Sequence, residues 1–347
     1  MNAKQYSLWT IGLTILALFI FASPTIIIDP YFHYHTSING LHYPIDNQRY
    51  QNDGMLKHFS YNAIIAGTSM TLNFKPEEFN ELFGVNSLHV SFLGGSYKEI
   101  NNNIMTGLEY NPDVKIVLRG LDIDFLDKDK DYMKYDNYPE YLYDKNIFND
   151  VNYVLNKEIF DLSWKVLSNT EDEEKKELSA DFYSQYYSKE IVLSSFERTP
   201  LSDNIVEFTQ EDEQRIRESI RQNVTSAAEK YPEVTFYLFW TPYNICYWDG
   251  VYREGQIEYV LEAERVAMEE MFQCANIRIF AFDNNFDLVC DLDNYCDRIH
   301  YSPAINSAIL KWIKNGEYEL TNDNYIEHVN SMSVFYKTYD FDAIYEQ

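Results

Sequence analysis

Basic residues are scarce in this 347-residue sequence, whereas acidic residues are abundant. Lys and Arg number 28 and Asp and Glu number 55, so the formal net charge is −27. Such a chain repels the phosphate backbone of nucleic acids, which argues against nucleic-acid binding as its function. Internal repeats and low-complexity arrays are also missing. With 46% hydrophobic residues, the length fits one large domain with a sizeable core.

Cysteine is sparse as well, and no C-x-x-C motif occurs. The missing motif argues against a zinc knuckle and against a thioredoxin-type redox centre. The four cysteines are Cys246, Cys274, Cys290 and Cys296, an even number that permits two disulfides. Because only five residues separate Cys290 from Cys296, we expect these two to pair, leaving Cys246 with Cys274. Four free, partly buried thiols are the alternative.

Stretches that begin like metal sites are incomplete. Residues 127–131 alternate Asp and Lys as a calcium loop would begin, but position six is Tyr132 rather than Gly and position twelve is Tyr138 rather than Glu. The same Gly and Glu are missing around a second acidic group, Asp287, Asp291, Asp293 and Asp297. Three histidines near the N-terminal apolar run are expected to be interfacial polar groups rather than metal ligands: His33, His35 and His42. We therefore predict no metal site and no cofactor.

An uncharged run of 21 residues, 8–28, lies near the N-terminus. At about 1.5 Å rise per residue, a helix of this length spans the hydrocarbon core of a bilayer. Lys4 precedes the run and Asp29 follows it, so the positive-inside rule predicts a cytoplasmic N-terminus and an extracytoplasmic remainder. A cleaved signal peptide is the alternative, but the run is longer than a usual signal core and only Ala22-Ser23-Pro24 stands in for a cleavage site.

Short apolar runs alternate with helical patterns through the rest of the chain. The expected strands are 63–66, 88–92, 115–118, 235–240 and 277–282, and the expected helices are 98–110, 211–231, 256–274 and 303–314. This alternation predicts an α/β fold with a parallel sheet covered by helices on both faces. We expect an anchor over 1–28, a connector over 29–60, the α/β domain over 61–320 and a C-terminal tail over 321–347. Residues 124–210 break the alternation and are predicted to be an insertion that serves as a lid, an acceptor-binding element or plain scaffold.

A candidate nucleophile stands directly after the first predicted strand. The turn reads Ala66-Gly67-Thr68-Ser69-Met70, and a serine just past a strand, preceded by a glycine that allows a sharp turn, is where parallel-sheet hydrolases place their nucleophile. Near the C-terminus, Asp297 and His300 are three residues apart in a polar loop. A histidine that takes a proton from a serine needs such a carboxylate on its other ring nitrogen. A polar cap on the following helix is the alternative role for His300.

These motifs resemble those of the SGNH (GDSL-type) hydrolase superfamily, and more closely those of its membrane-anchored DltD-like branch. The resemblance covers about residues 55–315. It implies a three-layer α/β/α flavodoxin-like sandwich with Ser69 as nucleophile, and with Asp297 and His300 completing the triad in the final D-x-x-H block. Gly94 and Gly95 match the block whose backbone N–H helps to form the oxyanion hole.

The third block of the family is usually G-x-N-D, in which the Asn side chain is a second oxyanion donor. Here the sequence is Gly120-Leu121-Asp122-Ile123-Asp124, and an ionised carboxylate cannot donate to an oxyanion. Asp122 would have to be protonated or turned away, and Arg119 or a backbone N–H would have to substitute. Loss of one such donor commonly costs about 2.7–4 kcal/mol of transition-state stabilisation.

The sequence thus predicts an extracytoplasmic, membrane-anchored O-acyltransferase or esterase with a Ser-His-Asp triad. The resemblance implies a cell-envelope polysaccharide or a teichoic-acid-like polymer as its partner, and a membrane-bound acyltransferase as a second partner. The alternative is a non-catalytic SGNH-like scaffold that presents the polymer to that acyltransferase. The missing block-three Asn favours this alternative.

Overall fold

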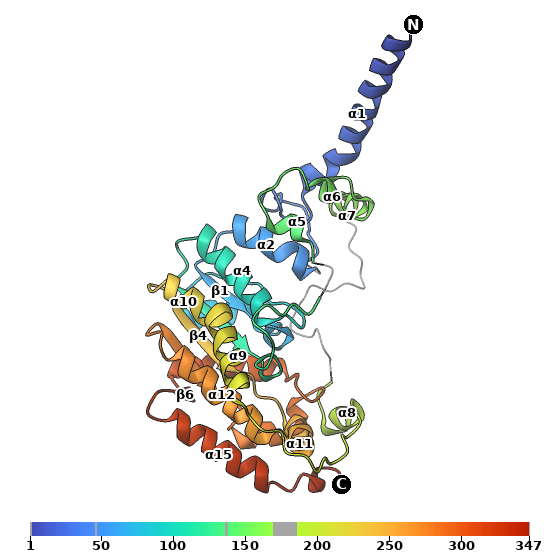
Figure 1. Cartoon of the computed structure of the whole chain (residues 1–347). Helices are drawn as coiled ribbons and strands as arrows, with labels where there is room; N and C mark the ends of the chain where they lie inside the picture. The colour runs from blue at the N-terminus through green and yellow to red at the C-terminus, as the bar shows by residue number, and fades with distance from the viewer. Residues whose placement is uncertain (1, 46, 136–137, 169–185, 347) are drawn as a thin grey trace. The chain divides into compact units, whose positions relative to one another are not determined.

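The computed structural model describes residues 2–45, 47–135, 138–168 and 186–346. The described chain forms two units. The first comprises residues 2–60 together with the described part of 135–168, and the second comprises 61–134 and 186–346. The positions of the two units in Figure 1 relative to one another are not determined.

The first unit begins with α1 (Ala3–Ile28), which among the described residues is the one helix long and apolar enough to cross a membrane. Its large apolar side chains are mostly exposed, as expected of a helix that faces lipid rather than a protein core. Asn2 forms a capping box with Gln5 at its start. At its C-terminal end Phe21 stacks on Phe160, with ring centroids 4.6 Å apart. A spanning helix was predicted from the sequence, and its length and composition bear that out.

The remainder of the first unit is a small helical fold built around Asp29. This buried carboxylate ends α1 and accepts hydrogen bonds from the backbone N–H groups of His33, Tyr34 and His35 and from the Tyr153 hydroxyl. The predicted connector is therefore a folded part of this unit. Its other helices are α2 (Gln48–His58), α5 (Glu140–Tyr143), α6 (Val151–Val154) and α7 (Lys157–Ser168).

The second unit contains a six-stranded sheet of order β2-β1-β3-β4-β5-β6. The first five strands are parallel in the doubly wound order 2-1-3-4-5, and β6 is antiparallel to β5. The strands are β1 (Ala63–Ala66), β2 (Ser87–His89), β3 (Ile116–Leu121), β4 (Thr235–Trp240), β5 (Ile277–Ala281) and β6 (Glu319–Leu320). The flavodoxin-like α/β fold predicted from the sequence is confirmed. Runs such as Ala63–Ala66 are wholly buried, as expected of central parallel strands.

Helices cover both faces of this sheet. Along one face lie α4 (Tyr97–Tyr110), α9 (Gln210–Ile220), α10 (Ser226–Lys230) and α12 (Ile257–Met271), as Figure 1 shows. A π-helical segment, Arg221–Thr225, joins α9 to α10. Two helices that pack against each other, α3 (Pro76–Phe83) and α14 (Pro303–Asn315), lie on the other face, where Phe83 contacts Tyr237 of β4. Shorter or peripheral helices are α8 (Lys189–Ser194), α11 (Ile245–Arg253), α13 (Phe286–Cys290) and α15 (Tyr325–Thr338).

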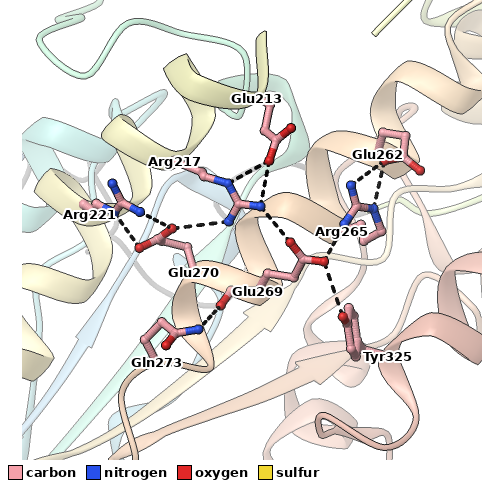
Figure 2. A network of polar contacts seen from close by, with 9 residues as sticks. All are labelled: Glu213, Arg217, Arg221, Glu262, Arg265, Glu269, Glu270, Gln273 and Tyr325. Atoms are coloured by element: carbon pink, nitrogen blue, oxygen red, sulfur yellow. Dashed lines mark hydrogen bonds and ion pairs between the residues drawn. The ribbon is translucent and has the colours of Figure 1, made fainter. Parts of the chain in front are cut away.

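A network of ion pairs joins α9 to α12 (Figure 2). Arg217 pairs with Glu213 on its own helix and with Glu269 and Glu270 on α12, and Arg221 also pairs with Glu270. Glu270 is buried but the other side chains are partly exposed, so each pair contributes little to stability by itself. Together they fix α9 on α12 where the two helices pack.

Two regions differ from the sequence-based division. The segment expected to be a tail contains α15, which packs on α12 and buries Met332 and Tyr336. Residues 138–168 of the expected insertion belong to the first unit, whereas 186–210 belong to the second. Residues 136–137 and 169–185 of that insertion lie outside the described residues.

Candidate active site

The turn after β1 presents Ser69. Gly67 has φ = +153°, and a Cβ there would lie 2.6 Å from Thr71 Cγ2, so only glycine fits without a shift. Ser69 then begins a short 3-10 helix, Ser69–Thr71. Thr68 caps this helix, because its Oγ1 accepts the Met70 N–H at 3.3 Å. Ser69 is thus held at the carboxyl end of β1 by glycine geometry and a side-chain cap.

Ser69, His300 and Asp297 lie in one chain of hydrogen bonds. His300 Nε2 is 2.9 Å from Ser69 Oγ, and His300 Nδ1 is 2.6 Å from Asp297 Oδ2. The other carboxylate oxygen, Oδ1, accepts the backbone N–H groups of Ile299 at 2.8 Å and His300 at 2.7 Å. The structure therefore brings together the three side chains that the sequence singled out. The arrangement is that of a nucleophile, a base and a carboxylate that orients the base.

The environment of Asp297 keeps it ionised. Burial by itself would raise the pKa of this carboxyl, but the hydrogen bonds from the His300 ring and from two backbone N–H groups outweigh it and lower the pKa below its ordinary value. The Asp297 side chain is still 34% exposed and that of His300 is 14% exposed. An ionised Asp297 fixes the proton of His300 on Nδ1, which leaves Nε2 free to accept the proton of Ser69.

Further hydrogen bonds hold together the two loops that carry the candidate triad. The Tyr301 hydroxyl donates to Met70 O at 3.0 Å, next to Ser69. Asn306 of α14 donates to the same carbonyl at 3.3 Å. On the far side of the loop, Asn244 donates to Asp297 O at 2.7 Å. These contacts help to set the spacing between Ser69 and His300 without using the side chains of the triad.

Asp122, an oxyanion candidate from the sequence, is buried beneath the serine turn. Its Oδ2 accepts the Thr68 hydroxyl at 2.8 Å and its Oδ1 accepts the Tyr243 hydroxyl at 2.5 Å. Burial raises its pKa to about 6, although the bonds from Tyr243 and Thr68 act to lower it. Both oxygens are therefore engaged in holding the residue next to Ser69, which is a structural task.

The other oxyanion candidates separate clearly. The Arg119 guanidinium donates to Asn223 O at 2.6 Å and to Tyr97 O at 3.3 Å, so it serves the packing between β3 and the helices. The Gly95 N–H donates to Phe92 O at 3.1 Å. Gly94 adopts φ = +58°, and within the described residues its N–H donates to no protein group. The Phe92 N–H donates to Gly67 O at 2.8 Å, so the segment after β2 continues beside the serine turn. Gly94 follows directly after this segment.

A polar cluster that the sequence did not predict supports the serine turn. Thr71 Oγ1 lies 2.5 Å from Ser91 Oγ and donates to Thr68 O at 2.9 Å. Ser91 Oγ in turn lies 2.7 Å from His89 Nε2. Burial lowers the pKa of His89 to about 4, so its imidazole is neutral at neutral pH. These residues form no sequence motif. Some of their hydrogen-bond partners are distant in the sequence, and the others are common residue types.

A cavity of about 410 Å³ adjoins the Asp297 loop. Its lining is mainly polar and includes Asp124, Tyr247, Gln256, Asp297 and Arg298. Ser195 and Phe196, which belong to the insertion predicted from the sequence, also line it. This part of the insertion therefore borders a cavity that is also lined by Asp297 of the candidate triad.

The disulfide expectation is wrong, since all four cysteines are free. Cys296 lies next to the triad, and its N–H donates to His300 O at 3.0 Å as part of a short bridge between Tyr295 and Tyr301. That pairing holds the loop in place of a disulfide. Burial raises the pKa of the Cys296 thiol to about 12, with the charge of Asp297 adding to the effect, so the thiol stays protonated.

Comparison with known proteins adds little. No protein-family model matches the chain, and no curated protein matches it. Among solved structures, a protein from Streptococcus pneumonia described as a candidate platelet activating factor is 14% identical, and the match covers 78% of this chain and 90% of that chain with a TM-score of 0.39. A superposition that loose carries no argument about function. The case for a function stands on the residues of this chain.

Proposed function

We propose that this protein is a serine-dependent O-acyltransferase or esterase of the SGNH type that acts outside the membrane on a polymer of the cell envelope. The observation that carries the proposal is the hydrogen-bonded chain from Ser69 through His300 to Asp297, with distances of 2.9 and 2.6 Å. The parallel sheet supports it, because both loops follow strands whose carboxyl ends meet at one edge.

The proposed reaction has two steps. Ser69 Oγ attacks the carbonyl carbon of an ester while its proton passes to His300 Nε2, and the leaving alcohol takes that proton as the C–O bond breaks. An acceptor hydroxyl then gives its proton to His300 and attacks the acyl carbon, and His300 returns that proton to Ser69 Oγ as the bond between Oγ and the acyl group breaks. Asp297 stabilises the imidazolium in both steps. The Gly94 N–H is the proposed donor to the oxyanion.

A polar acceptor is favoured by the cavity that adjoins Asp297. Its carboxylate, amide and guanidinium groups suit the hydroxyls of a sugar or polyol, and two aromatic side chains, Tyr247 and Phe196, also line it. If a polymer hydroxyl is the acceptor, the protein is a transferase. If water is the acceptor, it is an esterase. We propose a membrane-bound acyltransferase as a second partner.

The proposed topology has the N-terminus in the cytoplasm and the second unit outside. It rests on α1 and on the charges that flank its apolar run, Lys4 before and Asp29 after. Protease added to intact cells should degrade the second unit. Protection of a C-terminal tag while the membrane is sealed would contradict this orientation.

A non-catalytic scaffold is the second candidate function. The observation that favours it is Asp122, whose position lacks an amide donor and whose two carboxylate oxygens already accept hydrogen bonds. Such a protein would keep the polymer-binding surface without an activated serine.

Labelling with a fluorophosphonate separates the two functions. The full-length protein, purified in detergent, is treated with the probe and digested for mass spectrometry. We expect a single adduct on Ser69, no adduct in Ser69→Ala and very slow labelling in His300→Ala. Ser194→Ala, which removes an exposed serine on α8, is the matched control and should label like the wild type. A wild-type protein that labels no faster than His300→Ala would leave the scaffold as the function.

A further inference from the structure

Three ionisable side chains meet in the interior of the second unit, away from the candidate active site. Glu264 lies on α12, Asp283 follows β5 and His328 lies on α15. Glu264 and Asp283 are fully buried, and His328 is 4% exposed. One ligand atom of each lies within 4.8 Å of the others. The mechanism proposed above uses none of them.

The polar atoms of this cluster have no hydrogen-bond partner. Both carboxylate oxygens of Glu264, both of Asp283 and both ring nitrogens of His328 are buried without a hydrogen bond among the described residues. His328 Nε2 lies 3.5 Å from Asp283 Oδ1, which is an ion-pair distance. Unpaired buried carboxylates are costly, so a folded protein is expected to supply a compensating charge.

We propose that Glu264, Asp283 and His328 bind one divalent transition-metal ion of the zinc class. Two carboxylates carry two negative charges and the neutral imidazole carries none, so the three side chains together balance the charge of a divalent cation. The imidazole selects zinc-like ions over calcium or magnesium, which take oxygen ligands. Three protein ligands leave a coordination position for water.

The geometry fits such an ion after small side-chain movements. Because no two ligand atoms are further apart than 4.8 Å, each has to move by less than about 1 Å to reach the ~2.0–2.2 Å typical of zinc ligands around a common centre.

A cavity next to His328 would give the ion and a water ligand access to the site. A cavity of about 290 Å³ is lined by His328 together with Asn284, Asn324, Glu327 and Ser331. The Asn284 Oδ1 atom is likewise buried without a hydrogen-bond partner. The site would tie α15 to the end of β5 and to α12, so its role is to hold the C-terminal helix on the α/β unit.

Metal content and stability of the full-length protein in detergent test the proposal. The protein is stripped with a chelator and dialysed against zinc chloride, then analysed for metal and for its Tm. We expect one zinc per chain and a higher Tm than that of the stripped protein. Cobalt in place of zinc should give visible absorption bands of a low-coordinate site. Substoichiometric zinc with an unchanged Tm would overturn the proposal, and neither measurement depends on acyl-transfer activity.

Variants identify the ligands. Loss of a residue that hydrogen-bonds to a metal ligand weakens metal binding by up to roughly 100-fold. Glu264→Gln and His328→Gln each change a proposed ligand itself, so each should weaken zinc binding by more than that. The matched control is Glu258→Gln, also on α12, whose exposed carboxylate accepts a hydrogen bond from Ser333 of α15 at 2.7 Å. This control should bind zinc like the wild type. Two results would contradict the proposal. In the first, Glu264→Gln binds zinc as well as the wild type does. In the second, neither protein binds zinc and the two are equally stable, which would mean that the three residues share protons instead. Should the variants fail to fold, the cobalt spectrum of the wild type still decides.

Discussion

Replacing Asp122 by Asn tests the role of the buried carboxyl beneath the serine turn. Asp122 has a pKa of about 6 in the folded protein against 3.8 as its ordinary value. Because the folded-state pKa is raised, the folded protein binds more protons than the unfolded chain between those values. The free energy of unfolding therefore falls as the pH rises through this window.

The magnitude follows from the same shift. A difference of 6 − 3.8 pKa units, at 1.36 kcal/mol per unit, amounts to about 3 kcal/mol once the pH exceeds 6. An Asn resembles the protonated acid, and the hydroxyls of Thr68 and Tyr243 can each donate or accept, so one of them can turn to meet the new NH₂ group. We expect Asp122→Asn to be about 3 kcal/mol more stable than the wild type at pH 8 and nearly equal to it at pH 4.

Guanidinium unfolding of the full-length protein in detergent, followed by tryptophan fluorescence, measures this difference, since Trp240 and Trp248 are fully buried in the second unit. Asp113→Asn, an exposed change in the turn before β3, is the control and should shift stability by less than about 0.5 kcal/mol at either pH. A stability difference that is the same at pH 4 and pH 8 would refute the argument. The rate of ester hydrolysis should stay unchanged or fall. A rate that rises with no gain in stability would show that Asp122 faces the oxyanion instead.

Three other perturbations address the site and the fold. Gly67→Ala should lower the free energy of unfolding by about 1–3 kcal/mol and remove most of the fluorophosphonate labelling, because the φ of +153° and the 2.6 Å contact with Thr71 exclude a Cβ. Labelling equal to that of the wild type would contradict this. Asp297→Asn should keep the far-UV circular dichroism but lower the turnover of p-nitrophenyl acetate by about 10⁴-fold, because the His300 tautomer is no longer fixed. Arg217→Met should lower the free energy of unfolding by about 1 kcal/mol, measured by thermal unfolding without guanidine. This loss should become smaller at high salt, because the ion pairs are partly exposed. A loss that does not depend on salt would indicate that packing is responsible instead.

The strands could be predicted where burial leaves a local mark. Ala63–Ala66 and Thr235–Trp240 were predicted with their observed bounds, because central parallel strands are continuous apolar runs. The antiparallel strand Glu319–Leu320 could not be predicted, since two residues at an edge carry no pattern. Helix α15 was missed for a different reason: it buries four of its residues among many polar ones, and only its packing on α12 shows which face is inside.

The candidate triad was accessible from the sequence because each half carries a local signal. Gly67 and Ser69 form one motif directly after a strand, and Asp297 and His300 form another within one turn. Tyr243 and Tyr301 were not accessible, because nothing local distinguishes them among 30 tyrosines. The three ligands of the proposed metal site are 19 and 45 positions apart, a spacing that matches no metal-binding motif.

The engagement of Asp122 also decides which assay can test the candidate enzyme. If the amide donor of the third block is replaced by a carboxylate that accepts from Thr68 and Tyr243, the oxyanion depends on backbone N–H groups such as that of Gly94. One missing donor costs about 10²–10³ in rate, so turnover of a poor ester can fall below detection although the triad is intact. Covalent trapping is less demanding, because it requires a single attack by Ser69 on an activated phosphorus centre. A protein that labels at Ser69 in a His300-dependent way but turns over slowly is therefore still a serine acyl-transfer enzyme, and its slow turnover reflects the oxyanion site rather than an inert nucleophile.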